Sequence, residues 1–219
     1  MSSNEANMNP VDLRVRYTKG ELLESEVPGN PYELFKLWFS DAQSAEILEP
    51  NAMTLSSINN EGYPNSRIVL LKGLNETGFV FYTNYLSQKA NDLDRNPKCS
   101  LVFLWKENER QVRIVGNAIR QTHELNAEYF ASRPRESQIG AWASKQSNMV
   151  EDRETLIKSF KDYEREFHGK DIPCPNFWGG YLVVPEKIEF WQGRPGRLHD
   201  RLVYEKQNNY NWKTYRLYP

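Results

Sequence analysis

From residue 52 onward, the chain is dominated by short apolar runs separated by turn residues. The runs AMTLSSI (52–58), NSRIVLLKGL (65–74) and FVFYTN (79–84) are rich in β-branched and aromatic residues, and the Gly-containing segments 59–62 and 75–78 join them. Strands linked this closely pair antiparallel, because parallel neighbours need a crossover of a dozen or more residues. The pattern therefore predicts an antiparallel sheet.

The rest of the chain adds more strands and several helices. Asn30 and Pro31 are a good cap and first residue for a helix over 31–48, and Ser87 can cap a helix over 88–95. Further helices are expected at 122–131, 135–145 and 150–168, and further strands at 98–106, 110–121, 179–184, 187–192, 197–206 and 212–218. We expect a β-rich α+β protein, with helices packed around a β-barrel.

Composition excludes several classes of protein. The formal net charge is -1, which favours no polyanionic partner, and no RNA-binding motif accompanies the aromatic and basic residues near 103–120, so no nucleic acid is expected. No apolar run approaches the roughly 18 residues of a membrane span, so no membrane is expected. The polar start lacks a signal core and the two cysteines stand apart, which favours a cytoplasmic location. We expect a flexible tail over 1–12 and one domain over 13–219.

The common nucleotide, hydrolase and metal motifs are missing from the sequence. No G-x-G-x-x-G follows a strand, and neither a P-loop nor a G-x-S-x-G motif occurs. His123 and His168 stand alone in polar segments, and the cysteines form no ligand cluster, so no metal site is expected.

The segment EFWQGRPGRLHDR (189–201) is the strongest functional signal. Arg197, His199 and Arg201 alternate, so on a strand they share one face, with Trp191 just upstream. Cations on one face repel one another unless an anionic or electron-rich group lies against them, which favours a ligand site over a solvated strand face.

Three other segments carry weaker signals. RIVLLK (67–72) places Arg67 and Lys72 at opposite ends of an apolar strand, where they serve a ligand or simply reach solvent. YTNYLSQKA (82–90) leads a strand into a helix N-terminus, which favours an anion. In YFASRPRESQIGAWASKQS, residues Tyr129, Arg133 and Ser137 recur every four residues and suit a phosphate, although Pro134 interrupts the helix and Arg133 can equally be an exposed arginine.

Taken together, RIVLLK, FYTN, SQKA, RQVR, YFASRPRESQIGAWASKQS, FWGG and EFWQGRPGRLHDR resemble the pyridoxamine (pyridoxine) 5′-phosphate oxidase family. The resemblance spans residues 67–201 and implies the split β-barrel of FMN-binding proteins with peripheral helices. It also implies a homodimer with FMN at the subunit interface.

The resemblance carries over a set of site residues. It implies FMN contacts at Arg67, Ile68, Val69, Leu70, Leu71, Lys72, Tyr82, Thr83, Gln88, Lys89, Gln111, Gln146, Ser147, Trp191 and Arg201. It implies a substrate-phosphate site at Lys72, Tyr129, Arg133 and Ser137. Arg197 and His199, with Leu198 between them, would contact the pyridine ring as the catalytic residues, and Arg14 and Tyr17 would belong to a covering N-terminal piece.

One departure from the family pattern bears on the cofactor. Many members have Ser-Arg-Lys where this chain has Ser87-Gln88-Lys89. Gln88 can donate a hydrogen bond to a phosphate but brings no charge, so FMN is held more weakly or another cation compensates.

The implied reaction is the oxidation of pyridoxamine 5′-phosphate or pyridoxine 5′-phosphate to pyridoxal 5′-phosphate. A hydride leaves the 4′ carbon for the flavin, O2 reoxidises the flavin to give H2O2, and the amine substrate also releases NH3. Two alternatives remain: a non-catalytic protein that binds pyridoxal phosphate or FMN, and a flavin reductase on the same barrel that uses a nicotinamide cofactor.

Overall fold

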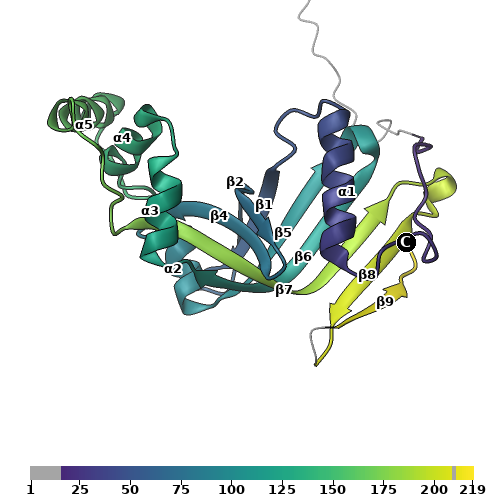
Figure 1. The fold of residues 1–219 in the computed structure, drawn as a ribbon. Coiled ribbons are helices and arrows are strands. Elements are labelled where there is room, and N and C mark those ends of the chain that lie inside the picture. The colour runs from purple at the N-terminus through teal and green to yellow at the C-terminus, as the bar shows by residue number, and fades with distance from the viewer. Residues whose placement is uncertain (1–15, 209–210) are drawn as a thin grey trace, which may run out of the picture.

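The computed structural model describes residues 16–208 and 211–219. The expected tail over 1–12 and the expected site residue Arg14 lie outside the described residues. Figure 1 shows a strongly curled sheet, with helices gathered at both ends of it.

The described strands form one antiparallel sheet. Its main path runs in the order β2-β1-β5-β6-β7-β4-β3, and β8 pairs with both β7 and β9. Their bounds are β1 Ala52–Ile58, β2 Pro64–Leu70, β3 Gly73–Asn75, β4 Gly78–Asn84, β5 Lys98–Trp105, β6 Arg110–Arg120, β7 Trp178–Gln192, β8 Asp200–Lys206 and β9 Trp212–Arg216. The prediction of an antiparallel β-rich fold is confirmed, and the curled sheet forms the half-barrel expected of a split barrel.

Strand β7 connects the two ends of the molecule. Its first residues pair with β4, its last residues pair with β8, and β6 pairs along most of its length. The prediction of two strands over 179–184 and 187–192 is wrong, because the chain stays paired through Pro185 at an irregularity opposite Val115 and Gly116. A bulge tolerates proline, which has no N–H to donate. Gly116 allows the close approach, since a Cβ there would lie 2.2 Å from the Val184 carbonyl oxygen.

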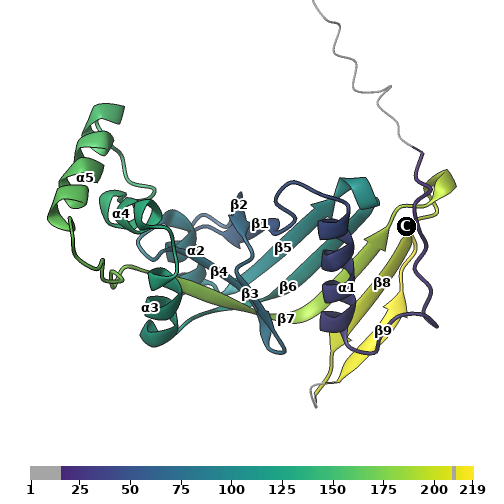
Figure 2. The ribbon, with the colours of Figure 1, turned by 45° about the horizontal axis from the view of Figure 1, so that its top comes forward.

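The helices lie in two groups (Figures 1 and 2). Helix α1 (Pro31–Ser44) lies near β8 and β9, and the Asn30 side chain caps it by accepting from the Tyr32 N–H. Helices α3 (His123–Ala131), α4 (Arg135–Ala143) and α5 (Arg153–Glu166) gather at the other end, beyond α2 (Gln88–Arg95). The 3-10 turns are η2 (Lys106–Asn108) and η3 (Pro195–Arg197).

Several predicted elements have different bounds in the structure, and three of them show why. Helix α1 ends at Ser44 rather than near 48, because Glu46 and Glu49 adopt left-handed backbone. Helix α5 starts after its cap, Asp152, rather than at 150. Strand β8 starts at Asp200 rather than at 197, because Gly196 and Arg197 both have positive φ and turn the chain.

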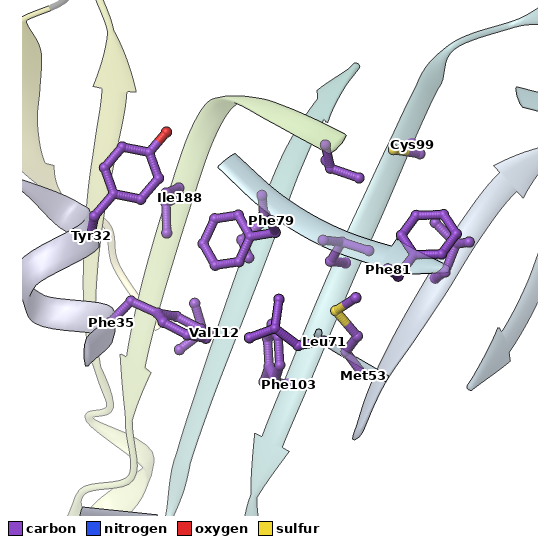
Figure 3. Close-up of a cluster of buried hydrophobic side chains, with 14 of the residues drawn as sticks. Tyr32, Phe35, Met53, Leu71, Phe79, Phe81, Cys99, Phe103, Val112 and Ile188 are labelled. Carbon is purple, nitrogen blue, oxygen red and sulfur yellow. The ribbon is translucent and has the colours of Figure 1, made fainter. Parts of the chain in front are cut away.

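The core lies between α1 and the inner face of the sheet. Figure 3 shows side chains from the helix and several strands converging there, among them Phe35, Phe79 and Phe103. Phe35 is fully buried, with its ring centroid 5.0 Å from those of both Phe79 and Phe103. Burial of such large apolar surfaces is the main source of folding free energy.

Within residues 16–208 and 211–219, no helix is long and apolar enough to cross a membrane. The same residues contain no group of three or more His, Cys, Asp and Glu side chains placed to hold a metal ion.

Replacing Phe35 with alanine should lower the free energy of unfolding by about 3–5 kcal/mol, because it leaves a cavity where helix and sheet meet. Leu37→Ala on the same helix is the matched control, since Leu37 is 58% exposed, and it should change stability by less than about 1 kcal/mol. Urea unfolding at equal protein concentration measures both. Equal losses in the two variants would contradict this account of the core.

Candidate functional site

The largest group of predicted site residues lines one cavity of about 490 Å3, here called the main cavity. It lies where β2, β4, α2, α3, α4 and the start of β7 meet. The predicted residues among its lining are Ile68, Val69, Leu70, Lys72, Tyr82, Thr83, Lys89, Tyr129, Arg133, Ser137 and Gln146. A volume of this size suits a small ligand or cofactor.

Lys89 places an ammonium group, partly buried among polar side chains, in the lining of the main cavity. Its Nζ lies 3.0 Å from Gln146 Oε1 and 3.2 Å from Thr83 Oγ1. Burial, and secondarily the charge of Arg67, lower the pKa of Lys89 to about 8. A cation whose charge is disfavoured in this way gains from an anion placed beside it.

Arg67 is held next to the main cavity by partners that the sequence did not reveal. Its Nη1 donates to Ser57 Oγ at 2.8 Å, and its Nη2 lies 3.7 Å from the buried Asp92 carboxylate. Asp92 also accepts from the Ser57 hydroxyl at 2.8 Å. Ser57 and Asp92 belong to separate elements, β1 and α2, so no local sequence motif predicts that they contact Arg67.

Arg133 is the second desolvated cation of the main cavity. Burial lowers its pKa, and its Nη1 is a buried atom with no hydrogen-bond partner. The guanidinium carbon lies 4.6 Å from the Trp178 ring centroid, which is within cation–π range. Trp178 lies in the FWGG segment, but no pattern in the sequence singles it out as a site residue.

Aromatic rings form one wall of the main cavity. Tyr82 stacks on Tyr129 with centroids 3.9 Å apart, and on Trp178 with centroids 5.2 Å apart. The structure brings Tyr129, Arg133 and Ser137 together in the lining of this cavity, although the chain breaks its helix at Pro134 between α3 and α4. This wall offers flat apolar faces next to hydroxyl and guanidinium donors.

Several predicted residues lie beside the main cavity rather than in its lining. The Leu71 side chain is buried in the core cluster, and its backbone N–H and carbonyl are both hydrogen-bonded to Asn51, so the structure leaves no polar group of Leu71 open to the cavity. Gln88 and Ser147 line a smaller neighbouring hollow of about 340 Å3, and Arg95 of helix α2 lies in the same hollow. Arg95 is therefore a cation near the neutral Gln88.

The remaining predicted residues lie at the far end of β7. Gln111, Trp191 and Arg201 are direct register partners on β6, β7 and β8, so their side chains form a row on one face of the sheet. Their neighbours Val112, Phe190 and Leu202 face the core. The row Gln111, Trp191 and Arg201, with the rings of Tyr17 and His199, is here called the Trp191 cluster.

The rings of the Trp191 cluster pack closely. The His199 centroid lies 4.7 Å from that of Trp191, and Tyr17 stands edge-on to both at 5.6 Å from Trp191 and 5.5 Å from His199. His199 Nδ1 accepts from the Arg194 N–H at 3.1 Å, which requires this nitrogen to be unprotonated. Burial, and secondarily the charge of Arg197, lower the pKa of His199, which also favours the neutral ring.

The expected geometry of Arg197, His199 and Arg201 needs correction. Arg197 lies in η3 with φ of 63°, and His199 precedes β8, so the three do not alternate along one strand. The segment R-P-G-R forms a tight turn, which ends the extended conformation that the alternation assumed. Arg197 and Leu198 are both exposed there, and Leu198 is 74% exposed.

Arg201 already has a carboxylate partner. Its Nε donates to Glu189 Oε1 at 2.9 Å and its Nη2 to Glu189 Oε2 at 3.1 Å. Arg113 donates to the same carboxylate at 3.1 Å. Glu189 therefore orients Arg201 beside Trp191, a role for which the sequence shows only an acidic residue in a strand.

The main cavity and the Trp191 cluster lie at opposite ends of β7. Trp178 lines the cavity and Trp191 belongs to the cluster, a separation of about 40 Å along a strand. One chain therefore does not bring all of the predicted residues together around one ligand.

The chain matches known proteins over nearly its whole length. The family profile described as "Pyridoxamine 5'-phosphate oxidase" matches residues 39–164. A second profile, "Pyridoxine 5'-phosphate oxidase C-terminal dimerisation region", matches residues 178–219. The second match includes Trp191 and Arg201, together with the turn that carries Arg197 and His199.

Named relatives and solved structures agree with these matches. The pyridoxine/pyridoxamine 5′-phosphate oxidase 2 of Hydrogenovibrio crunogenus is 49% identical, covering 97% of this chain and 99% of the relative. The oxidase of the same name from Synechocystis sp. is 50% identical, covering 95% and 97%. Among solved structures, PhzG from Burkholderia lata in complex with tetrahydrophenazine-1-carboxylic acid superposes with a TM-score of 0.86 at 29% identity, covering 92% and 100%.

A related FMN-binding protein from Nostoc punctiforme shares the fold, with a TM-score of 0.68 at 14% identity, covering 84% and 97%. The family profile covers more than half of the chain, and both oxidases align along almost all of it. The chain therefore belongs to the pyridoxine/pyridoxamine 5′-phosphate oxidase family.

Proposed function

We propose that this protein is an FMN-dependent oxidase of vitamin B6 metabolism. It converts pyridoxamine 5′-phosphate and pyridoxine 5′-phosphate to pyridoxal 5′-phosphate, using O2 and releasing H2O2, with NH3 from the amine. The observation that carries this proposal is the main cavity, where two desolvated cations, Lys89 and Arg133, face one space lined by aromatic rings. Full-length relatives named as these oxidases support the same substrates.

The residues present fit FMN. Lys89 and Arg67 are cations whose pKa values burial lowers, and Thr83 and Gln146 add polar groups beside them, which suits the FMN phosphate. The strand segment Ile68–Leu70 adds an apolar edge for a ring system. FMN would supply the two-electron acceptor chemistry, and the protein residues would hold and orient the reactants.

The residues around Arg133 fit the phosphate of the substrate. Arg133 Nη1 is buried without a partner, and such an orphan donor is costly unless a ligand satisfies it. Tyr129 and Ser137 bring hydroxyl groups to the same cavity, and Lys72 brings a further cation. Holding the phosphate at this end fixes the position of the reacting carbon, which lowers the entropic cost of the reaction.

The far end of β7 supports a homodimer with a shared site. One chain holds the main cavity and the Trp191 cluster about 40 Å apart along β7, so a partner chain is needed to bring one of each together. The dimerisation profile over residues 178–219 supports this arrangement. In the proposed dimer, Gln111, Trp191 and Arg201 of one chain contact FMN held by the other.

Arg197 and His199 would act on the pyridine ring of the substrate. The exposed Arg197 guanidinium is free to face the phenolate oxygen and fix the orientation of the ring. His199 accepts a backbone hydrogen bond at Nδ1, so in the neutral ring its Nε2 carries the proton and can donate it to the substrate.

The two alternatives make different demands on the site. A non-catalytic binding protein has no need of the Arg197 and His199 pair beside Trp191. A flavin reductase that uses a nicotinamide cofactor has no need of the Tyr129, Arg133 and Ser137 group. Peroxide release on adding pyridoxamine 5′-phosphate separates the proposed oxidase from both.

The purified chain should take up FMN and release peroxide with pyridoxamine 5′-phosphate. Arg133→Leu should raise KM by about 10- to 100-fold, because it removes charge-assisted hydrogen bonds to the phosphate, while bound flavin changes little. Arg165→Leu is the matched control, since Arg165 is an exposed arginine on α5. Failure to take up FMN would refute the proposed function. An Arg133→Leu variant that purifies colourless but binds pyridoxamine 5′-phosphate with unchanged affinity would mean that the two phosphate positions are exchanged.

FMN binding should weaken as pH rises through about 8. Lys89 has a lowered pKa of about 8 in the free protein, and an FMN phosphate favours its protonated form, so the dissociation constant should rise by up to about tenfold per pH unit above that value. Flavin fluorescence titrations between pH 7 and 9 measure this. Lys89→Met should bind more weakly at pH 7 and lose this dependence, whereas Lys98→Met, at an exposed site, should retain it. A wild-type dissociation constant that stays flat over this range would exclude Lys89 from the phosphate site.

Mixed dimers should reveal the shared site. Arg197→Met should lose most turnover while keeping FMN, and Arg133→Leu should be nearly inactive at low substrate concentration. If each site takes Arg133 from one chain and Arg197 from the other, co-expression of the two variants should restore about one quarter of wild-type activity, because half of the dimers are mixed and each has one intact site. No recovery in purified mixed dimers would place both residues in the same chain's site.

A further inference from the structure

Glu109 is a buried acidic residue to which the proposed reaction gives no role. It lies in the turn between η2 and β6, with φ of 56°, and only 7% of it is exposed. Left-handed backbone is unfavourable for a residue with a long side chain, and a buried carboxylate needs strong hydrogen bonds. Both costs indicate that the surrounding contacts hold this residue in place.

The Glu109 carboxylate binds backbone from the start of the described chain. Its Oε2 accepts from the Thr18 N–H at 2.7 Å and from the Lys19 N–H at 2.9 Å. Hydrogen bonds from amides to a charged oxygen are among the stronger ones in proteins. A residue 90 positions away in sequence therefore fixes the backbone immediately after Tyr17.

Tyr17, in turn, contacts two rings of the Trp191 cluster. Its ring stands edge-on to Trp191 and to His199. Gly193 provides the space, because a Cβ there would lie 2.7 Å from Tyr17 Cγ. The Tyr17 ring thus packs where a side chain on Gly193 would otherwise lie.

The main chain of Glu109 also binds the segment that carries His199. Its carbonyl oxygen accepts from the Gly193 N–H at 2.8 Å, and Gly193 begins the connection that carries Arg197 and His199. Arg194 of the same connection donates to the Gly20 carbonyl at 2.9 Å. Glu109 therefore joins the N-terminal segment to the segment that positions His199.

We propose that Glu109 is a positioning residue, whose carboxylate fixes Thr18 and Lys19 so that the Tyr17 ring holds His199 and Trp191 in place. The hydrogen bonds from Thr18 and Lys19 to Glu109 are enough to anchor this segment. The effect of the anchoring on substrate binding rests on the proposed function. Without the carboxylate, the segment 16–20 loses two hydrogen bonds that fix its backbone, and the Tyr17 ring is no longer held against His199.

The test compares Glu109→Ala and Glu109→Gln with Glu107→Gln in the full-length, FMN-loaded protein. Glu107 is the matched control, because it is an exposed glutamate in the same turn. The first readout is limited digestion with trypsin, followed by intact mass, since Arg16 and Lys19 are exposed cleavage sites within the anchored segment. The second is the steady-state oxidation of pyridoxamine 5′-phosphate.

Glu109→Ala should be cut after Arg16 and Lys19 about tenfold faster than wild type, and its KM should rise about tenfold with unchanged flavin content. Glu109→Gln should give values between those of wild type and Glu109→Ala, because its amide oxygen still accepts a hydrogen bond but carries no charge. This variant keeps the test usable if Glu109→Ala does not fold. Glu107→Gln should match wild type. Adding Tyr17→Ala to Glu109→Ala should raise KM little further, because both changes remove the same contact.

The outcomes separate this proposal from the proposed function. Cleavage and KM in both Glu109 variants equal to those of Glu107→Gln would overturn it. Faster cleavage with unchanged KM would also overturn it, since the segment would then be anchored without positioning the site. If wild type showed no oxidase activity, the proposed function would fail, and the cleavage readout would still decide whether Glu109 anchors the segment.

Discussion

The unbroken pairing of β7 is the constraint on which the rest of the structure depends. This one strand pairs with β4 at its start and β8 at its end, and it carries Trp178 and Trp191 to opposite ends of the molecule. Pairing survives Pro185 because the sheet has an irregularity there, opposite Gly116, and because Gly116 has no Cβ to meet the Val184 carbonyl. A strand broken at Pro185 would leave the two groups of site residues without a fixed relation.

Burial of cations beside aromatic rings gives the main cavity its chemical character. Arg67, Lys89 and Arg133 each have a pKa lowered mainly by desolvation, so each gains when an anion arrives. Arg67 forms an ion pair with Asp92 and a hydrogen bond with Ser57. Arg133 instead lies over the Trp178 ring, and its Nη1 has no hydrogen-bond partner. Arg133 therefore keeps a donor for a ligand, whereas the protein itself supplies partners to Arg67.

The Trp191 cluster combines residues on paired strands with residues on a neighbouring turn. Gln111, Trp191 and Arg201 are fixed by strand register, and Glu189 orients Arg201 from the neighbouring row. Arg197 and His199 instead lie on a turn with left-handed backbone, held through Gly193 and Arg194. Side chains on turns supported by a rigid sheet are a common arrangement for groups that contact substrate.

The sequence by itself determined the antiparallel strands and the positions of most helices, because turn residues and local periodicity encode these features over a few residues. It also indicated the family, through the resemblance that several short motifs carry together. It also grouped Tyr129, Arg133 and Ser137, which line one cavity in the structure, since they are close along the chain. Only the tertiary structure placed Asp92 beside Arg67, Trp178 under Arg133 and Glu109 against Thr18, because these contacts join distant segments that no local pattern relates. It also decided that Arg197 lies on a turn rather than a strand, since alternation of residue types does not encode the positive φ that Gly196 and Arg197 adopt.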